Sequence, residues 1–298
     1  MRIVPSELYS DLLSNLQIDR QNVNQAVEEA SSGQSVNTLS DNPLAAGQLV
    51  INRAQIADVD QFSYSINTVQ GSLNTADSAL NSVVSSLTQA VSVGTEAAGG
   101  TLTSTQLQAL AQQIDQISQQ AVGLANTTYQ GNYVFAGTTV TTQPYVASSS
   151  SPSGIAYAGN NNTNSVEVGE GQTVTLGLPG SQIFNAPGAD VFQSLTDLSN
   201  AIQSGNQNSI ASGISEVQTS LNNVVAQRSL YGDTLQQLNS DSTNLSQETL
   251  TLQQFQTNLI GANEAQVATN LSQAQTTLQA AIAAASQVSQ DSLLNYLK

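Results

Sequence analysis

Apolar residues recur at alternating steps of three and four positions over several long stretches of the chain, with polar residues between them. This heptad-like spacing predicts long helices, each carrying one narrow apolar stripe, here called a seam. One seam comprises Ile66, Val69, Leu73, Ala76, Leu80, Val83, Leu87 and Ala90. A second comprises Leu107, Leu110, Ile114, Ile117, Ala121 and Leu124. The stretch "VGTEAAGG" separates the two seams, and we expect the helix to break at these glycines.

The longest seam lies in the second half of the chain. It comprises Ile214, Val217, Leu221, Val224, Arg228, Tyr231, Leu235, Leu238, Leu245, Leu252 and Leu259. A single helix over this stretch would be on the order of 70 Å long. A shorter helical pattern precedes it and comprises Phe192, Leu195, Leu198 and Ile202.

Two further seams lie at the ends of the chain. The N-terminal seam comprises Tyr9, Leu12, Leu16, Val23, Ala26 and Ala30. The C-terminal seam comprises Val267, Leu271, Ala274, Leu278, Ala281, Ala285 and Val288. Both seams are thin and rich in Ala, so an isolated helix would bury too little apolar surface to offset its ordering entropy. We therefore predict that these residues form an assembly interface, in which the two ends pair and other copies of the chain complete the packing.

Short alternating segments replace the helical pattern between Gly131 and about Asp190: "NYVFAGTTV", "IAYAG", "NSVEVG" and "QTVTLGL". Clusters of Ser, Gly, Asn and Pro separate them, which is typical of strands joined by loops. The expected fold is mainly α with a small β insert: a long antiparallel, coiled-coil-like helical bundle formed by the N- and C-terminal halves, plus an inserted β-rich outer domain. The expected divisions are terminal helices at 1–32 and 265–298, a connecting turn at 33–42, a helical rod at 43–137 and 192–264, and the β domain at 138–191.

The stretch "SSGQSVNTLSDNPLAAG" supplies the connecting turn. Gly33 can end the first helix in a left-handed conformation. Ser40, Asp41 and Asn42 are residue types that cap helix N-termini, and Pro43 suits the first helical turn. We expect this turn to be a hinge where contacts between subunits adjust.

Composition narrows the possible partners. The 298-residue chain has 5 basic and 21 acidic residues and a net charge of −16, so its electrostatic field would repel nucleic acid and anionic membrane surfaces.

The N-terminus, "MRIVPSELYSDLL", has no apolar core of the kind that a secretory signal needs. The longest aliphatic run, at 280–285, is too short to span a bilayer. We expect a soluble protein without a cleaved signal peptide.

The chain offers few groups for catalysis or metal binding. It has no His and no Cys, and its one lysine is Lys298. These absences exclude imidazole acid–base chemistry, thiol chemistry and structural zinc sites. The acidic pairs Glu28/Glu29 and Glu167/Glu170 are interpreted as solvated charges. We expect no enzymatic activity, no cofactor and no metal.

Three segments resemble one protein family. "ASSGQSVNTLSDNPLAAGQLV" is similar to the N-terminal signature of the flagellin superfamily of bacterial flagellar axial proteins, although Asn42 stands where that family commonly has Asp. "GNYVFAG" resembles the strand that leaves the helical domain in the hook–filament junction family, hook-associated protein three. "DSLLNYLK" resembles the C-terminal ending of the same family.

The resemblance implies a structural role in the bacterial flagellum. Members of the family form a ring at the hook–filament junction by self-assembly, and the filament is built on that ring. The implied partners are other copies of the chain, a neighbouring hook-associated protein on the hook side, flagellin on the filament side and an export chaperone. The implied location is extracellular, after passage through the flagellar type III export apparatus.

Two other functions stay open at this stage. A filament flagellin would share the helical termini but would polymerise alone into long filaments. A secreted adhesin would use the β insert to bind a glycan or a host protein. An enzyme is a distant third alternative because catalytic groups are scarce.

Overall fold

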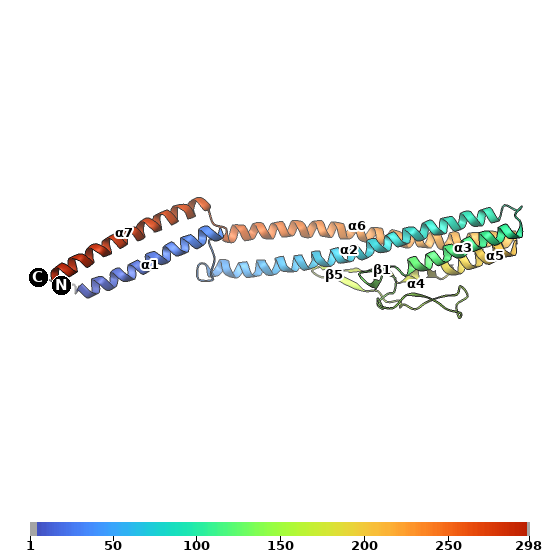
Figure 1. Cartoon of the computed structure of the whole chain (residues 1–298), viewed down its shortest axis with the longest axis horizontal. Helices are drawn as coiled ribbons and strands as arrows, with labels where there is room; N and C mark the ends of the chain where they lie inside the picture. The colour runs from blue at the N-terminus through green and yellow to red at the C-terminus, as the bar shows by residue number, and fades with distance from the viewer. Residues whose placement is uncertain (1–4, 297–298) are drawn as a thin grey trace. The chain divides into compact units, whose positions relative to one another are not determined.

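The computed structural model describes residues 5–296, with burial assigned for residues 10–287, and shows a mainly α-helical chain (Figure 1). The helices are α1 (Pro5–Ser32), α2 (Pro43–Ala97), α3 (Ser104–Ala125), α4 (Gly180–Ile183), α5 (Val191–Ser204), α6 (Gln207–Ile260) and α7 (Glu264–Tyr296). The strands all lie between α3 and α5. The prediction of a mainly α fold with a small β insert is confirmed.

The chain forms two compact units. The terminal unit comprises residues 1–58 and 247–298, and the central unit comprises residues 59–246. Both α2 and α6 contribute residues to each unit.

The seams predicted for the middle of the chain form the core of the central unit. All eight seam residues of α2 between Ile66 and Ala90 are at most 1% exposed. They share that core with α3 residues Ala111, Ile114, Ile117, Ala121 and Ala125 and with α6 residues Val217, Val224, Tyr231 and Leu238. The heptad spacing predicted these contacts because each seam lies on one face of its helix.

Polar cross-links hold α2 and α6 in antiparallel register within the central unit. Gln70 donates a hydrogen bond from Nε2 to Asn239 Oδ1, at 3.0 Å. Arg228 occupies a seam position and donates from Nε to Asp77 Oδ1 at 2.7 Å and from Nη1 to Asn81 Oδ1 at 2.8 Å. Both side chains of the ion pair are about one-third exposed, so the pair orients the helices more than it stabilises them.

The break predicted at "VGTEAAGG" falls within that stretch, in its second half. Helix α2 continues through Gly94 and ends at Ala97, and α3 begins at Ser104 with a capping box formed by Thr103 and Gln106. A Cβ added to Gly94 would lie 2.8 Å from Ile214 Cγ1. This glycine therefore permits close packing against α6 and does not end the helix.

The β insert consists of separate antiparallel hairpins in the described residues, with no larger sheet there. The pairs are β1 (Thr128–Tyr129) with β2 (Asn132–Tyr133), β3 (Tyr145–Ala147) with β4 (Ile155–Tyr157), β5 (Ser165–Gly169) with β6 (Gln172–Thr175), and β7 (Asn185–Ala186) with β8 (Ala189–Asp190). Isolated hairpins are marginally stable in water. The insert therefore needs a core of side chains to hold its hairpins together.

An aromatic cluster supplies that core, and the sequence analysis missed it. The rings of Phe135 and Phe184 meet edge to face with centroids 5.3 Å apart. The Tyr145 ring lies 5.5 Å from that of Phe184 and 5.0 Å from that of Phe192 on α5. All four side chains are fully buried. The cluster joins the insert to α5, because its members come from loops, strands and a helix that are distant in sequence.

Candidate assembly interface

Helices α1 and α7 lie side by side in the terminal unit (Figure 1). Ala26 and Val267 are buried, at 6% and 7% exposure. The half-buried members of the seams are Leu12, Leu16, Val23, Leu271, Ala274, Leu278, Ala281 and Ala285. Ala30 is exposed, and the side chains of Tyr9 and Val288 lie outside the residues for which burial is described. The structure thus brings the two helices together but leaves most of their seam residues only half-buried.

Large exposed apolar side chains are concentrated in the terminal unit. Among the described residues, thirteen are strongly exposed, and ten of these belong to this unit. The ten are Leu13, Ile18, Val27, Leu39, Leu44, Val50, Ile51, Leu250, Phe255 and Ile282. The sequence analysis followed one seam per helix and did not identify them. Exposed apolar side chains are therefore distributed unevenly between the two units.

The connecting turn is built by local hydrogen bonds. Gly33 has a left-handed φ of 66° and donates its N–H to Glu29 O at 3.0 Å, which ends α1. The Asn42 side chain caps α2 by accepting from the Ala45 N–H at 3.1 Å, and Pro43 is the first residue of that helix. Ser40 is exposed. Asp41 closes the turn instead of capping α2: it accepts from the N–H groups of Asn37 and Thr38, at 2.9 and 2.8 Å.

The turn is also paired with the short connection between α6 and α7. Ser35 donates its N–H to Ile260 O at 2.7 Å, and Ala262 donates its N–H to Gly33 O at 2.9 Å. These bonds flank an antiparallel bridge between Gln34 and Gly261. The connecting turn is therefore hydrogen-bonded to a connection in the second half of the chain, a pairing that the sequence analysis did not predict.

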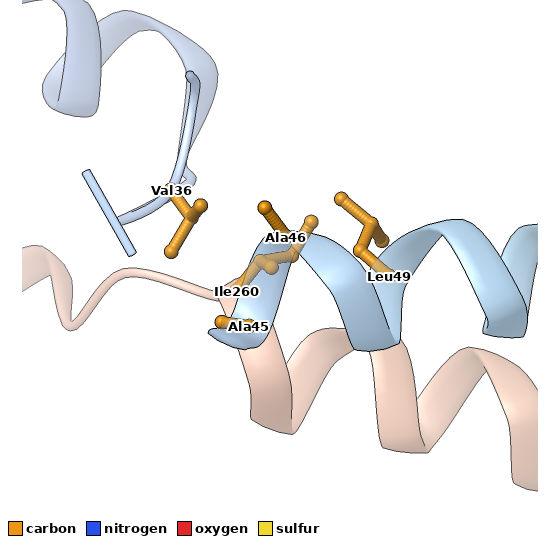
Figure 2. Close-up of a cluster of buried hydrophobic side chains, with 5 residues drawn as sticks. All are labelled: Val36, Ala45, Ala46, Leu49 and Ile260. Atoms are coloured by element: carbon orange, nitrogen blue, oxygen red, sulfur yellow. The ribbon is translucent and has the colours of Figure 1, made fainter. Parts of the chain in front are cut away.

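A small apolar cluster lies beside this bridge. Its five members are Val36, Ala45, Ala46, Leu49 and Ile260, and Figure 2 shows Ile260 between the start of α2 and the turn that carries Val36. All are less than 9% exposed, and Leu259 packs against them. The connecting turn is thus a packed element and not a loose linker.

The turn is expected to weaken in acid. Hydrogen bonds from the Thr38 and Asn37 N–H groups lower the pKa of Asp41 below its ordinary value. Because the folded pKa lies below that of the unfolded chain, the Asp41 carboxylate contributes fully above about pH 4, and its contribution is lost as the pH falls through the folded pKa. Amide NMR shifts of Asn37 and Thr38 should follow this titration. Asp41→Asn should abolish it, whereas the control Asp58→Asn should not; an unchanged titration in Asp41→Asn would contradict the assignment.

The central unit has a cavity of about 170 Å³ beside the insert. It lies between Thr68 and Ser72 of α2 and the segments that carry Tyr129, Tyr133 and Asn162. All residues that line it are uncharged. Aromatic rings combined with amide and hydroxyl groups can bind a neutral polar ligand.

Two further properties concern residues 5–296, the part of the chain that the structure describes. No helix there is both long enough and apolar enough to cross a bilayer. No group of three or more His, Cys, Asp or Glu side chains there is placed to hold a metal ion.

Comparisons with known proteins identify relatives of the chain. It is 25% identical over 187 residues to flagellar hook-associated protein 3 of Salmonella typhimurium, in an alignment that covers 62% of this chain and 57% of that relative. The match therefore spans less than two thirds of the relative's length. Among solved structures, Bacillus cereus FlgL is 25% identical with a TM-score of 0.60, covering 70% of this chain and 99% of that one. Flagellar hook-associated protein 3 from Legionella pneumophila is 13% identical with a TM-score of 0.64, covering 70% and 98%.

Family models match both helical ends of the chain. Residues 6–140 match the bacterial flagellin N-terminal helical region, and residues 214–297 match the bacterial flagellin C-terminal helical region. Together the two matches cover more than half of the 298 residues. The chain therefore belongs to the bacterial flagellin family.

Proposed function

We propose that this protein is a structural component of the bacterial flagellum that self-assembles into the junction ring between hook and filament. The observation that carries the proposal is the concentration of exposed apolar side chains on the terminal unit, whose own seams are only half buried. Such surface is costly for a protein that stays monomeric, and association with other copies would remove it from water. The relatives named hook-associated protein 3 support the junction over other flagellar positions.

Each segment of the chain has its own proposed role in the assembly. The terminal helices, residues 1–32 and 265–298, form the inner assembly coiled coil, and residues 33–42 form the hinge. The rod, residues 43–137 and 192–264, surrounds them, and residues 138–191 face outward. The partners are neighbouring copies, the adjacent hook-associated protein, flagellin and an export chaperone, and the location is the extracellular flagellum. The role is mechanical and requires no catalysis and no cofactor.

A deletion strain tests this function. Cells that lack the protein should build hooks, secrete flagellin into the medium and carry no filaments, and the intact gene should restore the filaments. Electron microscopy of the cell surface and an immunoblot of the medium measure these outcomes. Normal filaments in the deletion strain would overturn the proposal. Filaments that lack only their bulk subunit would point to a filament flagellin, which should also grow into long filaments from seeds in vitro.

The cavity of the central unit favours one alternative, a surface adhesin. Its uncharged lining of tyrosine, amide and hydroxyl groups suits a neutral carbohydrate. Binding of the intact protein to immobilised neutral glycans, with loss of binding in Tyr133→Ala, would support an adhesin. Normal filaments in the deletion strain together with such binding would favour the adhesin over the junction protein.

A further inference from the structure

Two charged residues lie in an otherwise uncharged part of the α1–α7 pair. Within residues 12–27 of α1, the charged residues are Asp19 and Arg20, and residues 265–290 of α7 include none. The next charged residues on α1 are eight positions away in either direction, which is about 12 Å along the helix. The ion pair recorded among the described residues lies in the central unit and involves neither Asp19 nor Arg20. Each of these two charges therefore needs a partner that its own helices do not supply.

Asp19 borders an open groove of about 270 Å³ between α1 and α7. The carboxylate is half-buried and occupies a seam position, seven residues from Leu12 and from Ala26. A carboxylate surrounded by amide and hydroxyl groups suits a guanidinium, which donates up to five hydrogen bonds in one plane. The groove, called the Asp19 groove, is lined by Asp19, Asn22, Asn270, Gln273, Ala274 and Thr277.

Arg20 lies on an exposed apolar stripe of α1. Leu13 and Val27 lie seven residues before and after it, which places the three side chains on one side of the helix. Leu13 and Val27 are each 47% exposed, and Arg20 is exposed too. Leu13, Arg20 and Val27 are called the α1 ridge. The positive charge is thus part of the apolar surface and lies between its two large side chains.

The ridge and the groove lie on opposite flanks of α1. Successive residues of a helix are about 100° apart around its axis, so Arg20 and Asn22 point in nearly opposite directions. Asn22 lines the groove, whereas Arg20 belongs to the ridge. The ridge therefore cannot reach the groove of its own chain. Two different surfaces on opposite flanks are the arrangement that a head-to-tail contact between copies requires.

Ring symmetry selects the residues that can meet. Neighbouring copies in a closed ring are related by rotation alone, so equivalent residues lie at the same height along the ring axis. Because Asp19 and Arg20 are consecutive, Arg20 of one copy lies at nearly the same height as Asp19 of the next. Copies with a net charge of −16 repel each other, and an Arg opposite an Asp favours one particular docking arrangement.

We propose that the α1 ridge of one copy packs into the Asp19 groove of the next copy, with the Arg20 guanidinium bound to the Asp19 carboxylate. This inference rests on the proposed self-assembly. The α7 side of the groove continues to the exposed residues Ala280 and Ala284, seven positions after Gln273 and Thr277. Because α1 and α7 run antiparallel, Leu13 and these alanines lie toward the same end of the pair (Figure 1). Leu13 of one copy therefore packs on the alanines of the next.

Charge reversal tests the pairing in the deletion strain. R20E and D19R should each give about tenfold fewer filaments per cell than the unaltered chain, counted by electron microscopy. Production of both variants in one cell should restore the filaments, because each contact between unlike chains then joins an acidic and a basic residue. The paired variant D19R/R20D, which keeps the net charge, should restore them too. R53E makes the same charge change as R20E at an exposed residue of α2 and should leave the filaments unchanged.

Three outcomes of charge reversal would overturn the pairing. The first is a normal number of filaments with R20E or with D19R alone. The second is a loss of filaments that D19R/R20D does not reverse. The third is a loss with D19R but not with R20E, which would show that the groove binds a different cation. An immunoblot of the medium measures the export of each variant.

Cysteine cross-linking tests the same contact in the assembled state, and the chain contains no cysteine of its own. In cells that carry both a Leu13→Cys chain and an Ala284→Cys chain, a short bismaleimide should give linked dimers, and neither chain alone should give them. Replacing Ala284→Cys by Ala268→Cys moves the thiol about 24 Å along α7 and should give none. Filaments that form without the expected cross-link would overturn the contact.

The two proposals fail in different ways. If the deletion strain makes normal filaments, the junction function fails, whatever the cross-linking shows. If that strain lacks filaments while R20E and the cysteine variants restore them without cross-linking, only the proposed contact fails. Far-UV circular dichroism of each variant confirms that the helices are retained. Asp19 is half-buried, and the other substituted side chains are exposed.

Discussion

Deletion of residues 1–32 or of residues 265–298 is expected to leave a folded helical protein that no longer assembles. The central unit has a core of its own, since the α2 seam residues from Ile66 to Ala90 are at most 1% exposed. The terminal seams are mostly half buried, so their loss removes little of the free energy that folds the central unit. Assembly should be lost because each deletion removes one half of the α1–α7 pair.

The measurements are far-UV circular dichroism, a urea unfolding curve and complementation of the deletion strain. The truncated proteins should keep a cooperative unfolding transition whose midpoint is close to that of the full chain, but neither should restore filaments. A deletion within the exposed loop 148–153 serves as a control that should leave assembly intact. Complete loss of the helical signal in the truncated proteins would show that the terminal helices are needed for folding.

Phe192→Ala is expected to destabilise the central unit by about 3–5 kcal/mol. The Phe192 side chain is fully buried, and its ring lies 5.0 Å from that of Tyr145 and 6.0 Å from that of Phe184. Truncation would leave a cavity at the place where α5 meets the insert. The hairpins of the insert cannot compensate for it, because none of them belongs to a larger sheet.

Urea unfolding followed by tyrosine fluorescence and by circular dichroism measures this loss. Tyr64→Ala is the matched control, since Tyr64 is an aromatic residue of the same unit that is 70% exposed, and it should change the free energy of unfolding by no more than about 0.5 kcal/mol. Equal effects of the two substitutions would show that the aromatic cluster does not stabilise the unit.

The helices could be predicted well because their signals are local. The seam from Ile66 to Ala90 repeats with the period of a helix, and one face of that helix is buried as expected. Asn42 and Pro43 mark the start of α2 because capping depends on residues within one turn. The break within "VGTEAAGG" was predicted, but the packing role of Gly94 was not, because it depends on Ile214, which lies far away in sequence.

The candidate site could be predicted only in part. The terminal seams were found because each lies on one helix, but the exposed residues Leu44, Ile51 and Phe255 lie off the seams and repeat too rarely to form a pattern. The pairing of Gln34 with Gly261 joins two turns that have no signal in common. The cluster of four aromatic rings likewise combines residues from separate segments of the chain.

Local patterning therefore establishes the helical class of this protein, the seams and most helix ends, because side-chain periodicity and capping act over one or two turns. Tertiary packing establishes which apolar side chains remain exposed, how the two connectors pair and where the insert has its core. These features depend on contacts between residues far apart in the chain, and no periodicity of a single segment encodes such contacts. The half-buried seams and the exposed apolar side chains of the terminal unit are consequently visible only once the helices have been placed against one another.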